Sequence, residues 1–304
     1  MEEKIRRSLL LGMTLSFTSM AHAISLTPTT DATTLVNNII GSGITVSAGT
    51  QTFTGITNMA ATFTGGTDPV GFSSGIVLMT GDVNDIPGPN PTNSSPETEG
   101  NGGSGGVADP SQSLGVAGDS DLDAIVGTTT NDAAVLEFEF QLGDGSAVGD
   151  LFFNFVFASE EYVDYVNSIY NDVFALFVDG ENIALIPGTS TPVSVNNVNG
   201  STNSAYYRNN VNNTNGFGDL LLDTAFDGLT TVLTATKLGL SAGVHTMKFA
   251  VADTSDGALD AAVFIQAGSF SDTDPGNIPE PTTLALMGIG LAGIGYRRRQ
   301  SMKA

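Results

Sequence analysis

The chain has 304 residues, with 10 Lys and Arg against 32 Asp and Glu, a formal net charge of −22, two His and no Cys. That length fits one large or two ordinary domains, and the absence of Cys excludes disulfides, thiolate metal sites and Cys nucleophiles. A body this anionic repels phosphates, because nucleic-acid binding draws its affinity from Lys and Arg. We therefore expect no nucleic-acid partner, whereas hard cations that bind oxygen ligands remain open.

Residues 1–23 predict a secretory signal peptide. A basic cluster, Lys4–Arg7, precedes the apolar run Ser8–Met20, and small residues follow at Ala21 and Ala23. Signal peptides have this order of charged, apolar and small segments. The alternative, a buried first helix, rarely begins with basic residues and ends on Ala-x-Ala. We expect the secretion machinery to export the chain and signal peptidase to cleave it after Ala23.

Residues 24–272 predict one all-β domain, a jelly-roll-like β-sandwich with one short N-terminal helix. Runs rich in Thr, Val and Phe alternate with Gly, Asn, Asp and Pro, which is typical of a sandwich. The helix is expected over 31–40, where apolar residues recur at helical spacing between an acid at Asp31 and a stop at Gly41. Residues 273–278 are expected to form a linker.

Period-two alternation predicts the middle strands. The run Ala133–Leu142 places its apolar even-numbered residues on one face, and Val135 and Glu137 on the other, which should be wet. The run Leu151–Phe157 is apolar on both faces except for Asn154, so we expect a central strand between two layers.

An Asp-Gly turn at 179–180 predicts a hairpin between Val173–Val178 and Ile183–Ile186. Three further strands are expected at Gly75–Thr80, Val244–Val251 and Ala261–Ile265, and an acidic loop joins the last two. Two long stretches, 84–118 and 196–218, are rich in Gly, Ser and Asn and predict surface loops. Loops of this length indicate function or disorder.

Three acidic clusters are the candidate metal ligands. They are Asp119, Asp121 and Asp123; Glu160, Glu161, Asp164 and Asp172; and Asp253, Asp256 and Asp260. The first begins like an EF-hand loop but lacks its later residues, since Ala124 replaces the required Gly and Thr130 replaces the bidentate Glu. The other two follow strands, where a sandwich presents its loops.

Gathered carboxylates repel one another, by about 4 kcal/mol for a pair 4 Å apart at an effective dielectric near 20. A divalent cation relieves that repulsion, and it would tie down the long loops of an exported domain that has no disulfides. We therefore predict Ca²⁺ as the cofactor of these clusters. The alternative, which fits any single Asp better, is a solvated acidic surface.

An enzymatic function is a weaker hypothesis. His245 is the one imidazole outside the leader. In a strand it lies on the same face as the apolar Met247 and Phe249, which favours a core or strand-end histidine over a general base. A glycosidase needs two carboxyls about 5–9.5 Å apart, and adjacent Glu160 and Glu161 point to opposite faces when extended. We expect no catalytic residues and retain a secreted carbohydrate-active hydrolase, with loop carboxylates, as an alternative.

Residues 279–304 form a tail of three parts. Pro279-Glu280-Pro281 precedes an apolar stretch, 282–296, and three arginines follow it, Arg297, Arg298 and Arg299. The stretch is a marginal transmembrane helix, about 22 Å long against a hydrocarbon core of ~30 Å, and the arginines would hold its end in the cytoplasm.

This tail resembles the PEP-CTERM sorting signal. The resemblance implies recognition by an exosortase-type enzyme, transient contact with the inner membrane through 282–296, removal of the helix, and delivery to the cell surface or exterior. The alternative is a permanently membrane-anchored envelope protein.

The body resembles the choice-of-anchor L family. The resemblance is carried by Phe157–Tyr162, Asn171–Phe174 and Asp179-Gly180, and by Gly75–Asp82, Gly118–Asp123, Asn131–Phe138 and Ala252–Phe264. It covers most of 31–270 and implies an extracellular, β-rich domain with no established reaction. The chain departs from the family at Ala261, where a Ser often follows the acid.

We predict an exported protein of the cell surface or extracellular matrix, whose calcium-stabilised β domain binds a ligand or builds structure. Exopolysaccharide is the partner that the resemblance to exosortase substrates implies.

Overall fold

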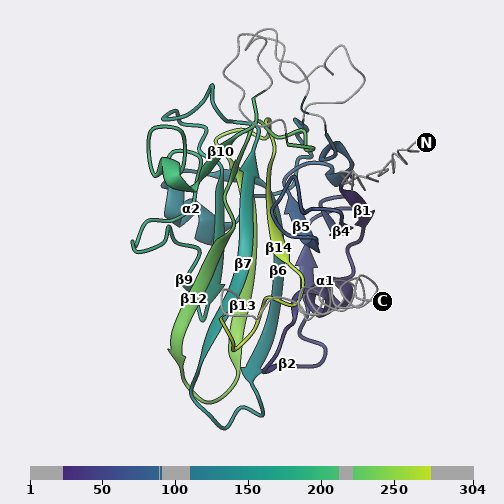
Figure 1. The fold of residues 1–304 in the computed structure, drawn as a ribbon, viewed down its shortest axis with the longest axis vertical. Helices are drawn as coiled ribbons and strands as arrows, with labels where there is room; N and C mark the ends of the chain where they lie inside the picture. Colours follow the sequence, from purple (N-terminus) through teal and green to yellow (C-terminus); the bar gives the residue numbers. More distant parts are fainter. Residues whose placement is uncertain (1–22, 89, 91–109, 212–221, 275–304) are drawn as a thin grey trace, which may run out of the picture.

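The computed structural model describes residues 23–88, 90, 110–211 and 222–274 (Figure 1). Two antiparallel sheets form the body. The eight-stranded sheet has the order β1 (Ser25–Pro28), β4 (Ala60–Thr64), β5 (Ser74–Met79), β14 (Ala261–Gln266), β7 (Gly149–Ser159), β11 (Gly228–Thr230) and β10 (Tyr207–Asn209), and β12 (Leu233–Leu240) also pairs with β7. The all-β sandwich expected from the sequence is confirmed.

The six-stranded sheet has the order β2 (Ile44–Val46), β6 (Thr130–Leu142), β13 (His245–Thr254), β8 (Val173–Val178) and β9 (Glu181–Asn182), with β3 (Thr52–Thr54) also paired to β6. Two α-helices, α1 (Ala32–Ile39) and α2 (Ser120–Val126), and two 3₁₀ turns, η1 (Val83–Asp85) and η2 (Ser204–Tyr206), complete the described elements. None of the helices in the described ranges is long and apolar enough to cross a membrane. The expected C-terminal span, 282–296, lies outside those ranges.

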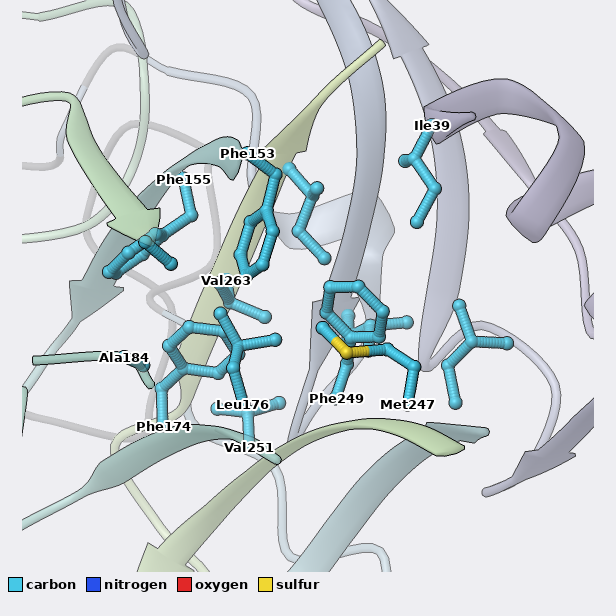
Figure 2. Close-up of a cluster of buried hydrophobic side chains, with 14 of the residues drawn as sticks. Ile39, Phe153, Phe155, Phe174, Leu176, Ala184, Met247, Phe249, Val251 and Val263 are labelled. Atoms are coloured by element: carbon cyan, nitrogen blue, oxygen red, sulfur yellow. The ribbon is translucent and has the colours of Figure 1, made fainter. Parts of the chain in front are cut away.

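Large apolar side chains from the two facing sheets form the main core (Figure 2). Phe153 of β7 and Phe249 of β13 meet across the layers with ring centroids 5.7 Å apart. Val156 and Phe264, on the opposite face of their sheet, belong to a second apolar cluster. Strand β7 is therefore buried on both faces, as its sequence predicts, and Asn154 is only partly buried.

Helix α1 closes one side of the core, and its ends follow from its sequence. The carboxylate of Asp31 accepts a hydrogen bond from the Thr33 amide and caps the helix. Leu35 and Ile39 are fully buried against the core. The backbone becomes extended at Ile40, so the helix ends at Ile39, just before the expected stop at Gly41.

The predicted hairpin forms, but its second strand was placed wrongly. Asp179 and Gly180 both have positive φ, 52° and 81°, as the tight turn requires. The returning strand β9 is only Glu181–Asn182. The side-chain oxygen of Asn182 accepts hydrogen bonds from the amides of Leu176 and Ala184. The Ile183 amide still donates to the Leu176 carbonyl. Because the Asn182 side chain takes the Leu176 amide, the return bond is missing and the strand does not continue through Ile183–Ile186, where it was expected.

Helix α2 covers part of the outer face of the six-stranded sheet, which the alternation in β6 had predicted to be wet. Leu122 of α2 is fully buried in a small apolar cluster with Ala133, Val135 and Phe177. Val135 is therefore only 5% exposed. Glu137, beyond the helix, is exposed as expected.

Lys248 of β13 holds α2 on the sheet. Its ammonium lies 2.6 Å from an Asp119 oxygen and 2.8 Å from an Asp121 oxygen, and 5.6 Å from the centre of the Phe177 ring. Asp119 also caps α2 by accepting hydrogen bonds from the Asp121 and Leu122 amides. The Lys248 ammonium therefore joins the start of α2 to the six-stranded sheet.

We predict that Lys248→Met lowers the free energy of unfolding by about 1–3 kcal/mol, because it removes the cation from the mostly buried Asp119 oxygen that Lys248 binds. The matched control is Lys237→Met, which removes a pair with an exposed Glu181 (66% exposed) and should cost less than about 1 kcal/mol. Urea unfolding of the three proteins measures the difference. Equal losses in the two variants would contradict this assignment.

Candidate functional site

Five strand ends meet at one end of the sandwich. The last residue of β7, Ser159, pairs with the first residue of β14, Ala261. Asp253, near the end of β13, pairs with Asn131 of β6, and the preceding Ala252 pairs with the first residue of β8. The acids that flank these strands are thereby brought to the same end of the molecule, at the top of Figure 1.

This end contains a group of buried carboxylic acids that we call the buried acid group. Its members are no more than 2% exposed: Asp132, Glu160, Glu161, Asp172, Asp227, Asp253 and Asp260. Four basic side chains occur in the described ranges, and all bind elsewhere. Lys237 pairs with Glu181, Lys248 with Asp119 and Asp121, His245 with Asp179, and Arg208 donates to backbone carbonyls.

Asp172 and Asp260 are held by hydrogen bonds from neighbouring strands. One oxygen of Asp172 accepts from the Ser159 hydroxyl at 3.0 Å, and the other accepts from the Thr254 amide at 3.2 Å. Asp260 accepts from the Gln112 amide at 3.2 Å and from the Thr80 hydroxyl at 3.5 Å. A Cβ at Gly81 would overlap the Asp260 carboxylate, so the chain needs glycine at that position.

Asp253 differs from these two residues. It is fully buried, and neither of its carboxyl oxygens has a hydrogen-bond partner at bonding distance and angle, although the Thr80 side chain lies near enough to oppose the rise in its pKa. An unpaired polar group inside a protein costs several kcal/mol, and an ionised one costs more. The residue is therefore either protonated or paired with a cation.

Burial raises the pKa values of Asp172 and Asp253 well above that of ordinary aspartate, and it raises the pKa of Asp260 to about 7. Neighbouring carboxylates add to this effect: Asp172, Asp260 and Asp132 raise the pKa of Asp253. The second and third acidic clusters of the sequence therefore interact, as the strand ends indicate.

Within the described ranges, no three Asp, Glu, His or Cys side chains form a group that could hold a metal ion by themselves. An ion bound here would need additional oxygen ligands from hydroxyls, amides or backbone carbonyls. Calcium accepts such ligands, six to eight in all. The donor set at this end is made of oxygen alone, which fits calcium and excludes a site built on soft ligands.

The remaining candidate ligands lie apart from Asp172, Asp253 and Asp260 or are exposed. Asp119 and Asp121 belong to the Lys248 contact, and Asp123 accepts hydrogen bonds from the amide and hydroxyl of Thr130. Asp164 is exposed in the turn after β7, and Asp256 is exposed in the loop after β13. Glu160 accepts from the Asp227 amide at 3.1 Å.

The acidic clusters in the sequence did not include Asp132, whose carboxylate accepts from the amides of Leu114 and Val116. Thr80, Asp85 and Gln112 also contact or influence Asp260. Asp132 has φ of 47°, an unusual backbone state that a lone Asp inside a strand sequence does not reveal.

Residues 24–271 match the profile of the choice-of-anchor L domain, which is most of the chain. The chain belongs to this family. Residues 277–299 of the choice-of-anchor L protein match the PEP-CTERM protein-sorting motif. No curated protein and no solved structure is significantly similar to it.

The two matches confirm both resemblances found in the sequence. The choice-of-anchor L protein is exported through an intermediate that is anchored in the membrane at its C-terminus, and it reaches the cell surface or the extracellular space. The sorting motif implies processing by an exosortase-type enzyme. The two matched families are anchoring and sorting families rather than catalytic ones.

His245 of the choice-of-anchor L domain lies far along β13 from the buried acid group, at the first residue of the strand. Its Nδ1 is 2.7 Å from an Asp179 oxygen, and its Nε2 is 2.9 Å from the Ser241 carbonyl oxygen. Burial favours the neutral ring, but these hydrogen bonds outweigh burial and raise the pKa of His245. The histidine joins two turns, as a strand-end residue, and is not placed as a general base.

We predict that His245→Gln destabilises the protein by about 1 kcal/mol or less at pH 5.5, since Asp179 is half exposed, and by less at pH 9. A raised histidine pKa gives stability that is fully present below its ordinary value of 6.5 and is lost as pH rises through the raised value. Asp179 has a lowered pKa, so it stays ionised down to strongly acidic pH. Urea unfolding of both proteins at the two pH values tests this; a difference independent of pH would refute it.

Proposed function

We propose that the exported choice-of-anchor L domain is a calcium-stabilised domain that binds or builds extracellular structure. The observation that carries the proposal is Asp253, which is fully buried with both carboxyl oxygens unpartnered. Asp172 and Asp260 lie near enough to raise its pKa by their charge. A cation is the simplest partner for this arrangement, because no basic side chain of the described ranges binds there.

Calcium fits the oxygen groups at this end of the domain. Its ligands are carboxylate, hydroxyl and carbonyl oxygens in loose geometry, and this end of the domain offers Asp172, Asp253 and Asp260 with the Thr80 hydroxyl beside them. The residues that would hold the ion come from four separate chain segments. An ion would therefore link loops that no disulfide can link in this protein.

The position of the buried acid group favours a binding role. The described chain leaves the sandwich beside Phe152, which exchanges backbone hydrogen bonds with Ser271. Seven residues of strand separate Phe152 from the acidic end at Ser159, about 23 Å at ~3.3 Å per residue. The acidic loops therefore lie well away from the point where the C-terminal tether begins, free to meet a partner; we propose exopolysaccharide as that partner.

Two alternatives carry over from the sequence. A permanently anchored envelope protein would retain 282–296, whereas the mature protein that we propose has lost this stretch. Mass spectrometry of the mature C-terminus distinguishes the two. A carbohydrate-active hydrolase gains one supporting observation, because Glu161 and Asp256, from different loops, line the same cavity. That alternative requires hydrolysis of a glycan that is abolished by Glu161→Gln in a protein that remains folded.

We predict that saturating calcium, compared with a chelator, raises the melting temperature by about 5–10 °C at pH 7.5, as expected for an ion present at ~100 times its Kd. Asp253→Asn should remove most of this shift, because it deletes the charge without changing side-chain size. Asp164→Asn, an exposed acid of the neighbouring loop, is the matched control and should keep the shift. Differential scanning calorimetry measures all three.

Two results would overturn the calcium proposal. One is a melting temperature that chelation leaves unchanged. The other is an Asp253→Asn protein that keeps the full shift. If Asp253→Asn is more stable than the wild type and neither responds to calcium, the buried acid group is held by protonation instead.

A further inference from the structure

The end of the sandwich opposite the buried acid group carries exposed apolar side chains. Among the described residues, four large apolar side chains are more than half exposed: Val148 (68%), Ile169 (70%), Leu238 (65%) and Val244 (55%). Ile169 lies at the acidic end, where its carbonyl accepts a hydrogen bond from the Ser255 hydroxyl, just after β13. The other three lie at the opposite end, and we call them the apolar tip.

Two hairpin turns that touch each other build the apolar tip. Val148 directly precedes β7, in the turn that leaves β6, and Val244 directly precedes β13, in the turn that leaves β12. The Gly243 amide of the second turn donates to the Gly145 carbonyl of the first at 3.0 Å. Leu238 lies in the irregular part of β12, where that strand pairs with the start of β7. These turns form the narrow lower end of the sandwich in Figure 1.

The last described residues lie beside the same end. Asp272, two residues before the end of the described chain, donates its amide to the Ser42 carbonyl at 3.1 Å. The neighbouring Gly43 carbonyl accepts from the Gly143 amide at 2.7 Å, in the turn between β6 and β7. That turn ends in Val148. Two hydrogen bonds therefore link the exit of the chain to the turn that carries part of the apolar tip.

The length of the tether places the apolar tip within reach of the membrane. The described chain ends at Asp274, and the apolar stretch 282–296 begins eight residues later, a span of at most about 28 Å. Four residues of strand, about 13 Å, separate Val148 from Phe152, where the tether departs, whereas the acidic end at Ser159 lies about 23 Å from Phe152 in the other direction. The tip can therefore touch the bilayer while the tether is slack, and the acidic end only when it is almost fully extended.

A bilayer surface suits the apolar tip better than a second protein does. Three aliphatic side chains on two turns cover far less than the ~800 Å² that each partner of a standard protein interface buries. Aliphatic groups leave water readily for the boundary of the acyl chains. Contact through three such groups is weak by itself, but a short tether raises the effective concentration of the surface to the millimolar range. The contact therefore forms in the anchored intermediate and is lost when the tail is removed.

The charges around the apolar tip select the kind of lipid. Asp144 lies exposed in the same turn as Val148. Lys237 and His245, which adjoin two tip residues in the chain, both bind acids. Anionic headgroups are therefore repelled rather than attracted at this end. The contact is made by the apolar side chains with a bilayer of zwitterionic headgroups.

We infer that the apolar tip rests on the surface of a zwitterionic membrane while the tail still anchors the protein, so that the buried acid group points away from the bilayer. The inference rests on the membrane-anchored intermediate that the sorting motif indicates and on the place where the described chain leaves the domain. It depends neither on calcium at Asp253 nor on the ligand of the domain.

The test is quenching of a fluorescent label by lipid, in the exported protein with its tail intact, one copy in each phosphatidylcholine nanodisc. Because the chain has no Cys, one introduced Cys takes one label. Ala147→Cys, next to Val148, reports on the apolar tip, and Ile169→Cys reports on the acidic end; both positions are exposed. We expect nitroxide-labelled acyl chains to quench the first label at least threefold more than the second, because such quenching needs contact.

Serine variants show whether the apolar groups make the contact. Val148→Ser, Leu238→Ser and Val244→Ser together should lower quenching of the Ala147→Cys label to the level of the Ile169→Cys label, and Leu238→Ser alone should lower it by about half. Ile169→Ser, which changes an equally exposed apolar residue at the acidic end, is the matched control and should leave it unchanged. All four residues are more than half exposed, so these variants should fold, and an unchanged melting temperature verifies it.

Three outcomes would overturn the inference: equal quenching of the two labels, quenching near the apolar tip that the triple serine variant keeps, or stronger quenching in discs of anionic phosphatidylglycerol. Contact that appears only with two copies in each disc would assign the apolar tip to a second copy of the chain and overturn the lipid assignment. The calcium shift of the melting temperature, measured on the same protein, separates the two proposals. A protein that keeps the calcium shift but shows no lipid contact overturns this inference alone.

Discussion

Repulsion among buried carboxylates is the constraint that shapes the loop end of this sandwich. Asp172, Asp253 and Asp260 lie in the interior, where burial raises their pKa values, and the charges of Asp172 and Asp260 raise that of Asp253 further. The basic side chains of the described residues all bind elsewhere. Ionised and unpaired, such a group would oppose folding by several kcal/mol for each residue. The fold persists because these residues bind a proton or a cation, and calcium is the partner we propose.

The apolar core offsets this repulsion by holding in place the strands that carry the acids. Phe153 and Phe155 of β7 and Phe249 of β13 are fully buried between the sheets, and the register of β7 with β14 places Ser159 opposite Ala261. The acids follow directly from these rigid strand ends. Preorganised oxygens of this kind would bind an ion without a large ordering cost.

Alternation predicted long inner strands such as β6, β7 and β13, but it missed the short strands β1 to β4, β10 and β11 and the eight-residue β12. The sequence placed the second and third acidic clusters after strands, and the structure shows that these strand ends lie at the same end of the sandwich. The pattern could not show that a helix covers Val135, because α2 is only seven residues long and its own sequence, rich in Asp, resembles a loop. For the same reason Asp119 was grouped with the metal candidates although it caps that helix. Asp132 could not be predicted, because nothing in the sequence around a single acid indicates that it is buried.

The most direct test of the account is to locate the ion itself. A crystal of the exported protein soaked with terbium, a calcium substitute, should show one anomalous peak within bonding distance of an Asp253 oxygen, and crystals of Asp253→Asn should lack it. A map with no peak at this end of the sandwich, or a peak that persists in the variant, would contradict the claim that a cation compensates these buried charges.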